Sequence, residues 1–314
     1  MEDSKPSRLE TKQILSHSLY IDLFNLILST VFAVVTGSVV MVVASLQSFA
    51  ELSSAGMLLY GRRYANKRPT KLHPFGFGKE LYYWLTLAVF VLVGAVAVIS
   101  IERGYSQLIT PVAVHHASWA IGALAVALVG NLYSFRTSLT KLLEGQPLSQ
   151  AWKAFLNSPL IATKTTVVLD VMGVTTGLFG IIGLVVYEVS GNLSQVEGVA
   201  AMIMGFALAL FAFIVPLSVR TFVTGQSAPP ETERRIRDAA REVAEVKHVL
   251  GLRTMVLSSD KLMVDIDVHL RDGLSTDQVE AAVERVKAAI EATGEGMRVH
   301  VEPDAYVDVH TNKP

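Results

Sequence analysis

Two pairs of polar side chains interrupt stretches that are otherwise apolar enough to lie in a membrane. Gln47 and Glu51 are four residues apart in one stretch, and Thr166 and Asp170 are four residues apart in another. Residues at this spacing share one face of a helix, so each pair presents two oxygen-bearing side chains in the same direction. A carboxylate in the hydrocarbon core costs about 3 kcal/mol or more, which indicates a functional site. These residue types are suited to binding a divalent cation.

The two pairs are expected to lie at similar depth. Asp170 lies about ten residues from the cytosolic end of its stretch, near the bilayer middle at ~1.5 Å per residue. If the pairs face one another, Glu51 and Asp170 supply two negative charges, Gln47 an amide oxygen and Thr166 a hydroxyl. The alternative is structural, because Gln and Thr in membrane helices often only hydrogen-bond to a neighbouring helix. The presence of a carboxylate in both pairs favours the cation site.

The composition is that of a membrane protein. Of the 314 residues, 51% are hydrophobic and 18% are charged, which is too apolar for a soluble domain of this size. The absence of Cys excludes disulfides and thiolate metal sites, and the net charge of −1 gives no sign of a nucleic-acid partner. Six stretches are long enough to cross a bilayer. They are predicted at 16–37, 39–62, 82–101, 118–135, 159–187 and 197–219.

The distribution of basic residues predicts the orientation of the six stretches. The connection between the second and third stretches contains Arg62, Arg63, Lys67, Arg68, Lys71 and Lys79. The turn at 36–38 and the loop at 187–197 contain no Lys or Arg. Since cytosolic loops carry the excess of basic residues, both termini are expected in the cytosol.

A charged, soluble sequence follows Ala228-Pro229-Pro230. Helical periodicity at 231–245, strand-like patterns at 248–257 and 262–270, a helix at 275–293 and a strand at 297–301 follow in that order. Ser275 and Gln278 form the pattern of a capping box at the start of the second helix. The order α-β-β-α-β predicts a small, ferredoxin-like α+β domain with its helices on one face of the sheet. The predicted fold class is therefore a six-helix α-helical membrane protein with a small C-terminal α+β cytosolic domain.

The chain resembles the cation diffusion facilitator family. The resemblance rests on the TGS turn at 36–38, the HPFGFGKE stretch at 73–80, the GQSAPPE junction at 225–231 and the order of six spans before an α+β domain. It covers nearly the whole chain, and HPFGFGKE is its most specific part. It implies a homodimer in the lipid bilayer that exports divalent cations from the cytosol in exchange for protons. The implied domains are a cytosolic segment at 1–15, a transport domain at 16–222 and a dimerisation and regulatory domain at 229–308.

The family's transport site comprises two such pairs, on the second and fifth spans, usually drawn from His and Asp. The matching positions here are Gln47, Glu51, Thr166 and Asp170, so the implied metal site has no histidine. An all-oxygen site favours Mn²⁺ or Mg²⁺ as the transported ion, whereas Zn²⁺ prefers imidazole and thiolate. Zn²⁺, Co²⁺, Ni²⁺ and Fe²⁺ stay open, because the affinity order favours late transition metals at most sites. Without histidine, Glu51 and Asp170 must also carry the exchanged protons.

Three further polar residues lie in or beside the spans. Asp22 and Asn25 either line an access path from the cytosol or serve as a cap or interhelical bond. Lys164 either extends to the cytosolic surface or acts as a replaceable counter-cation in the site.

The soluble domain has a second candidate metal site. Asp267, His300 and Glu302 fall near positions where some members of the family bind regulatory metal. Strand alternation alone also explains an outward-facing Asp267.

A cation transporter is the leading interpretation of the sequence. The alternative is a non-transporting membrane scaffold or regulator whose metal site has degenerated, since both positions that can hold His or Asp hold neutral oxygen donors. An enzyme is not expected, because no nucleophile–base pair, phosphate loop or cofactor motif is present. No organelle-targeting feature is present, which favours a bacterial inner membrane.

Overall fold

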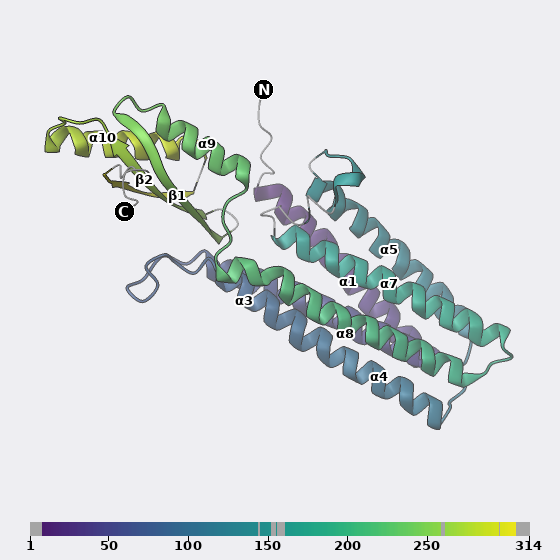
Figure 1. The fold of residues 1–314 in the computed structure, drawn as a ribbon. Coiled ribbons are helices and arrows are strands. Elements are labelled where there is room, and N and C mark those ends of the chain that lie inside the picture. Colours follow the sequence, from purple (N-terminus) through teal and green to yellow (C-terminus); the bar gives the residue numbers. More distant parts are fainter. Residues whose placement is uncertain are drawn as a thin grey trace, which may run out of the picture. The chain divides into compact units, whose positions relative to one another are not determined.

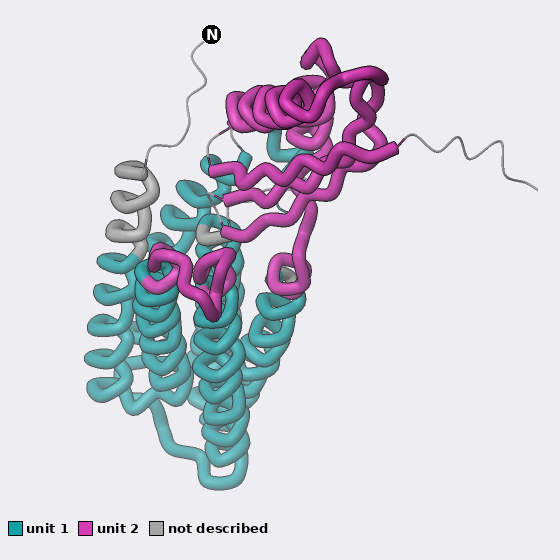
Figure 2. The backbone as a smooth tube through the Cα atoms, turned by 90° about the vertical axis from the view of Figure 1, so that its left-hand side faces the viewer, with its two compact units in different colours: residues 1–63, 81–219 teal, residues 64–80, 220–314 magenta. Residues whose placement is uncertain are grey.

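The computed structural model describes residues 8–143, 145–151, 155, 161–258, 261–294 and 296–305. Residues 1–7 of the expected N-terminal segment and 306–308 of the expected soluble domain lie outside the described residues. The chain divides into two compact units, residues 1–63 with 81–219 and residues 64–80 with 220–314 (Figure 2).

The first unit is a bundle of long helices (Figure 1). The helices are α1 (Arg8–Thr36), α2 (Val39–Ala65), α3 (Glu80–Leu87), α4 (Gly94–Ile109), α5 (Ala117–Leu143), α7 (Ile161–Val189) and α8 (Ser194–Thr224). A wide π-helical turn, η1 (Ala88–Val93), joins α3 to α4, so these three elements form one span. Among the described residues, six helical segments are long and apolar enough to cross a membrane, which confirms the six predicted spans.

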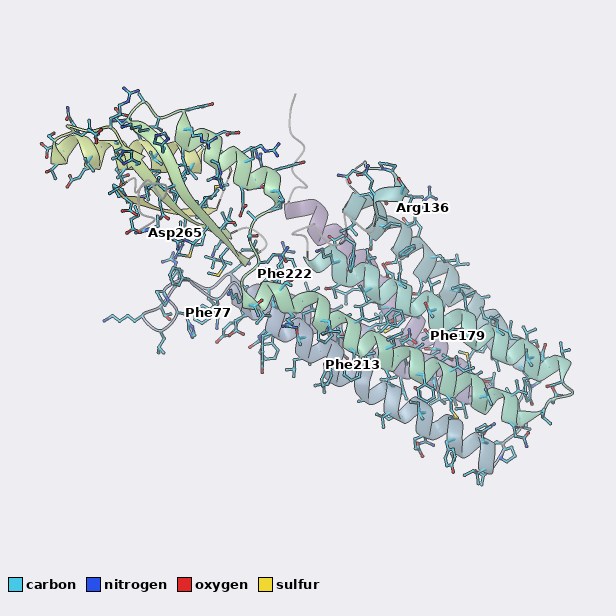
Figure 3. The ribbon with its side chains drawn as sticks, in the orientation of Figure 1. Phe77, Arg136, Phe179, Phe213, Phe222 and Asp265 are labelled. Carbon is cyan, nitrogen blue, oxygen red and sulfur yellow. The ribbon has the colours of Figure 1, made fainter. Side chains whose placement is uncertain are left out.

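Apolar side chains face outward from the bundle. On α1, Tyr20, Phe24 and Ile27 are exposed, whereas Asn25 and Ser29 are buried. Phe179 on α7 and Phe213 on α8 are also outward-facing (Figure 3). Lipid does not penalise exposed apolar surface, so membrane helices can bury their small and polar residues against one another. The interior of the bundle is therefore where the polar chemistry lies.

A buried carboxylate joins three helices where α1 turns into α2. Glu197, in the first turn of α8, accepts hydrogen bonds from the Ser38 hydroxyl and from the Val40 backbone N–H at 3.2 Å. Its second oxygen accepts from Nε2 of Gln107 on α4 at 3.1 Å. Gly37 has a positive φ of 66°, which allows the tight reversal before Ser38. The carboxylate thus satisfies an N–H group that the start of α2 leaves without a helical partner.

The second unit contains the α+β domain. Its elements are α9 (Pro230–Arg241), β1 (Val246–Ser258), β2 (Lys261–Leu270), α10 (Thr276–Glu291) and β3 (Met297–Pro303). The strand order is β1-β2-β3, with β1 antiparallel and β3 parallel to β2. Ser275 and Gln278 form the predicted capping box. The predicted α-β-β-α-β order is confirmed.

The core of this domain lies between the sheet and its two helices (Figure 1). Val264, Ile266 and Val268 of β2 are fully buried against residues of α9 and α10, which include Ile236 and Val286. Alternation along β2 directs Asp265 and Asp267 to the opposite face of the sheet. One face of the sheet is therefore apolar and covered, and the other is polar.

The HPFGFGKE stretch packs within the second unit. Arg298 of β3 donates a hydrogen bond to the carbonyl of Pro74 at 3.1 Å. Lys79 donates to the carbonyl of Val223 at 3.3 Å. Gly78 lies so close to Leu257 that a Cβ at this position would clash with the Leu257 backbone. The conformation of this loop is thus fixed by bonds to the end of α8 and to the sheet.

Candidate cation site

The carboxylates of α1, α2 and α7 line one buried cavity of about 30 Å³, which we name the carboxylate cavity. Asp22, Glu51 and Asp170 contribute these carboxylates, and Thr166 and Asn131 also line the cavity. The three acids do not converge into a preformed cluster, because among the described residues no group of three or more His, Asp or Glu is placed to hold a metal ion. A bound cation would therefore need water ligands or small side-chain movements to complete its coordination.

Two of the three acids of this cavity are almost fully buried, and Asp22 is half-buried. Glu51 is 5% exposed and Asp170 is 7% exposed. The hydroxyl groups of Ser134 and Ser138 on α5 lie beside the Asp170 carboxylate, yet its Oδ2 atom is buried without a hydrogen-bond partner among the described residues. Burying a carboxylate oxygen without a partner is costly, and a bound cation or proton removes that cost. The site is thus built for a positive charge.

Gln47 lies on the other side of Glu51. Its Nε2 donates a hydrogen bond of 2.9 Å to Oε1 of Glu51. Gln47 lines a neighbouring cavity, whereas Thr166 and Asp170 line the carboxylate cavity, and Glu51 lines both. The structure therefore brings Glu51, Thr166 and Asp170 around one cavity and does not place Gln47 in it.

Asp22, Asn25 and Lys164, the three further polar residues that the sequence singles out in or beside the spans, lie in different surroundings. Asp22 lines the carboxylate cavity. Asn25 lines the neighbouring cavity, and its Nδ2 donates to Oδ1 of Asn131 at 3.0 Å. Lys164 is buried, with Nζ 5.6 Å from the centre of the Phe155 ring, at a distance suited to a cation–π contact.

Sequence reasoning missed the polar face of α5. Asn131, Ser134 and Ser138 follow one another at spacings of three and four residues, which places them on one side of that helix. Asn131 lines both cavities, and the two serines lie beside Asp170. The spacing was the available signal, but it includes no carboxylate or histidine to mark it as a site.

The candidate regulatory residues lie on the polar face of the sheet. The parallel register pairs Asp267 with Glu302 and Asp265 with His300. Asp267 accepts a hydrogen bond from Nη2 of Arg253 at 3.1 Å, and Nδ1 of His300 lies 3.0 Å from Oδ1 of Asp265. Asp267 and His300 are thus each engaged by a protein neighbour, and a regulatory metal here stays a prediction.

Comparison with known protein families gives two matches. The model described as cation efflux transmembrane domain matches residues 15–218. The model described as cation efflux protein, cytoplasmic domain, matches residues 228–304. The second match begins at Ala228, where Ala228-Pro229-Pro230 separates the apolar from the charged sequence. A comparison with curated proteins gives no match.

Proposed function

Because the chain belongs to the cation efflux family, also called the cation diffusion facilitators, we propose that it exports a divalent metal cation through the carboxylate cavity, in exchange for protons. Family membership makes it an integral membrane transporter of divalent cations, not an enzyme, with a dimerisation domain at residues 228–304. The ion, the protons and the site residues are our proposal. We also propose that the protein lies in a bacterial inner membrane and that both termini are in the cytosol.

One observation supports this site above all others. Glu51 of α2 and Asp170 of α7 come from different helices, are buried, and line the same cavity, where Oδ2 of Asp170 has no hydrogen-bond partner among the described residues. Two negative charges at one dry position repel each other strongly unless a cation or protons neutralise them. A divalent cation balances both charges.

The chemistry of the cavity lining favours a hard cation. Among the described residues, its side-chain donors are the carboxylates of Asp22, Glu51 and Asp170, the hydroxyls of Ser54, Thr165 and Thr166 and the amide of Asn131, and none is an imidazole. Oxygen ligands suit Mn²⁺ and Mg²⁺, which retain water where protein ligands are few. We therefore propose Mn²⁺ or Mg²⁺ as the transported ion.

Proton exchange follows from competition for the same oxygens. A cation binds the carboxylates only in their deprotonated form, so its entry releases protons and its departure allows them to return. In this scheme Glu51 and Asp170 carry protons in one direction and the metal ion in the other.

A second candidate function is a non-transporting scaffold. Gln47 does not line the carboxylate cavity, and the described residues hold no preformed cluster of three metal-binding acids or histidines. A degenerate site would have these features. Transport measurements separate the two functions.

The test is cation flux into proteoliposomes that contain purified protein. Native protein and the Asp170→Asn variant are compared with a panel of Mn²⁺, Mg²⁺, Fe²⁺, Co²⁺, Ni²⁺ and Zn²⁺. Glu102→Gln on α4 makes the same carboxylate-to-amide change at an exposed position and serves as the control. We expect native and control proteins to carry Mn²⁺ or Mg²⁺, and Asp170→Asn to lose about tenfold or more of the flux. Equal flux from native and Asp170→Asn proteins for every ion would reject the site, and no flux from native protein would favour the scaffold.

A further inference from the structure

A second cavity of about 30 Å³ adjoins the carboxylate cavity. Glu51 and Asn131 line both cavities. The other polar side chains that line this second cavity are Asn25, Ser29, Gln47, Ser48 and Thr176. We name it the amide cavity, because three of its polar residues, Asn25, Gln47 and Asn131, are amides and only one, Glu51, is an acid.

The two cavities follow one another along the bundle. On α2, Met41 and Ala44 line the amide cavity, whereas Ser54 and Leu58, on the other side of Glu51, line the carboxylate cavity. On α7, Thr166 and Asp170 line the carboxylate cavity, and Thr176, further along the chain, lines the amide cavity. The two cavities therefore follow in the opposite chain order on α7 and α2. Glu51 thus lies at the boundary between the carboxylate cavity and the amide cavity.

The amide cavity contains a buried oxygen that no described residue satisfies. Asn25 is 3% exposed, and its Nδ2 is bound to Asn131, but its Oδ1 has no hydrogen-bond partner among the described residues. Leaving a buried acceptor without a hydrogen-bond partner destabilises a protein. Gln47 uses its nitrogen to bind Glu51, so its amide oxygen is not engaged in that bond. Amide oxygens of this kind are ligands for hard cations.

We propose that the amide cavity is a second cation site on the transport path, in which the amide oxygens of Asn25 and Gln47 and the Glu51 carboxylate hold a partly hydrated divalent cation. This inference rests on the proposed function. A cavity needs about 10–15 Å³ to hold one water molecule, so about 30 Å³ accommodates a cation with a water ligand. Asn131 is a positioning residue, since its Oδ1 holds the nitrogen of Asn25 and thereby orients the Asn25 oxygen.

The difference in charge between the two cavities gives them different roles. Three carboxylates line the first cavity, whereas Glu51 is the single carboxylate that lines the second. Neutral amide oxygens hold a cation less tightly than carboxylates do, and transport needs a site from which the ion can leave. The amide cavity therefore acts as the weaker site, reached from the carboxylate cavity by a rotation of Glu51.

The test separates equilibrium binding from transport in the full-length protein. Asn25→Leu keeps the branching and the number of heavy atoms of the side chain and replaces its amide oxygen and nitrogen with methyl groups. Asn131→Asp keeps an acceptor for the Asn25 nitrogen and adds a negative charge. Thr30→Val is the control on the same helix, because Thr30 is exposed and bonds to Leu26 and Ser45. Each protein is measured for flux in proteoliposomes and for binding in detergent, with the ion of highest native flux as the probe.

We expect Asn25→Leu to reduce flux about tenfold while the dissociation constant of the carboxylate cavity changes less than about twofold. Asn131→Asp is expected to tighten cation binding about tenfold, because it adds a charge at the boundary of both cavities. Thr30→Val should match the native protein in both measurements.

The failures of the two proposals are distinguishable. Native flux from Asn25→Leu overturns the second site even where Asp170→Asn abolishes transport. Unchanged binding in Asn131→Asp overturns both sites, because Asn131 lines both cavities. Native protein that carries no cation of the panel refutes the proposed function, and this inference with it.

Discussion

Removing the carboxylate of Glu197 should destabilise the helix bundle more than removing an exposed carboxylate does. In Glu197→Ala, the Ser38 hydroxyl, the Val40 N–H and the Gln107 amide lose their shared acceptor. Each buried polar group left without a partner costs about 1–3 kcal/mol. The Ser38 hydroxyl and the Val40 N–H lose their acceptor outright, whereas the Gln107 amide keeps its bond to the Val112 carbonyl at 2.7 Å, so the predicted loss is about 4 kcal/mol. Glu197→Gln keeps one acceptor oxygen but places a second nitrogen against Gln107, which predicts a loss of about 2 kcal/mol.

The free energy of unfolding can be measured by denaturant titration of the purified protein in mixed micelles. Glu188→Ala is the matched control, because Glu188 is an exposed acid near the same end of the bundle, and it should change stability by less than about 0.5 kcal/mol. The reasoning is refuted if Glu197→Ala costs no more than Glu188→Ala. It is also refuted if the Gln and Ala variants are equally stable, since the loss should follow the number of abandoned donors.

Three further outcomes follow from the structure. Gly173→Ala should reduce flux about tenfold, because a Cβ at position 173 would overlap the Asn131 amide. Gly56→Ala is the control and should retain native flux, since no heavy atom lies within 4 Å of its added Cβ. Equal flux from the two variants would contradict a role for the Asn131 position. Mn²⁺ affinity in detergent should fall as pH is lowered, because protons and metal compete for the same carboxylates; an affinity that is independent of pH would contradict the exchange scheme. Ile266→Ala should destabilise the soluble domain by about 3 kcal/mol, because the side chain is fully buried. Thermal unfolding of the full-length protein measures this loss, and an unchanged unfolding temperature would contradict the burial.

The six spans and the order of the soluble domain could be predicted from the sequence. Span number depends on length and hydropathy, which are local properties. The ends of the spans were predicted less well, because helical hydrogen bonding continues into polar flanks that hydropathy excludes. The helix of the third span, predicted to end at residue 101, continues to Ile109, and the helix α1 that contains the first span begins at Arg8, before the predicted residue 16. The π-helical turn at Ala88–Val93 has no counterpart in the apolar pattern.

The arrangement of the site could be predicted only in part. Spacing by four identifies residues on one face, but it also separates them by about 6 Å along the helix axis. That distance allows Gln47 and Glu51 to face successive cavities, and the sequence does not show where one cavity ends. Asn131 is a lone amide in an apolar stretch, so its place at both cavities depends on how α5 packs against α1 and α7.

Helix α1 contributes polar side chains to both cavities. Asp22 lines the carboxylate cavity and Asn25 lines the amide cavity, and three residues correspond to about 4.5 Å of helix. In the proposed pathway, a metal ion would therefore travel roughly the length of one hydrogen-bonded turn between its two resting positions. A step this short can be completed by side-chain rotations, without a continuous water-filled tunnel through the protein.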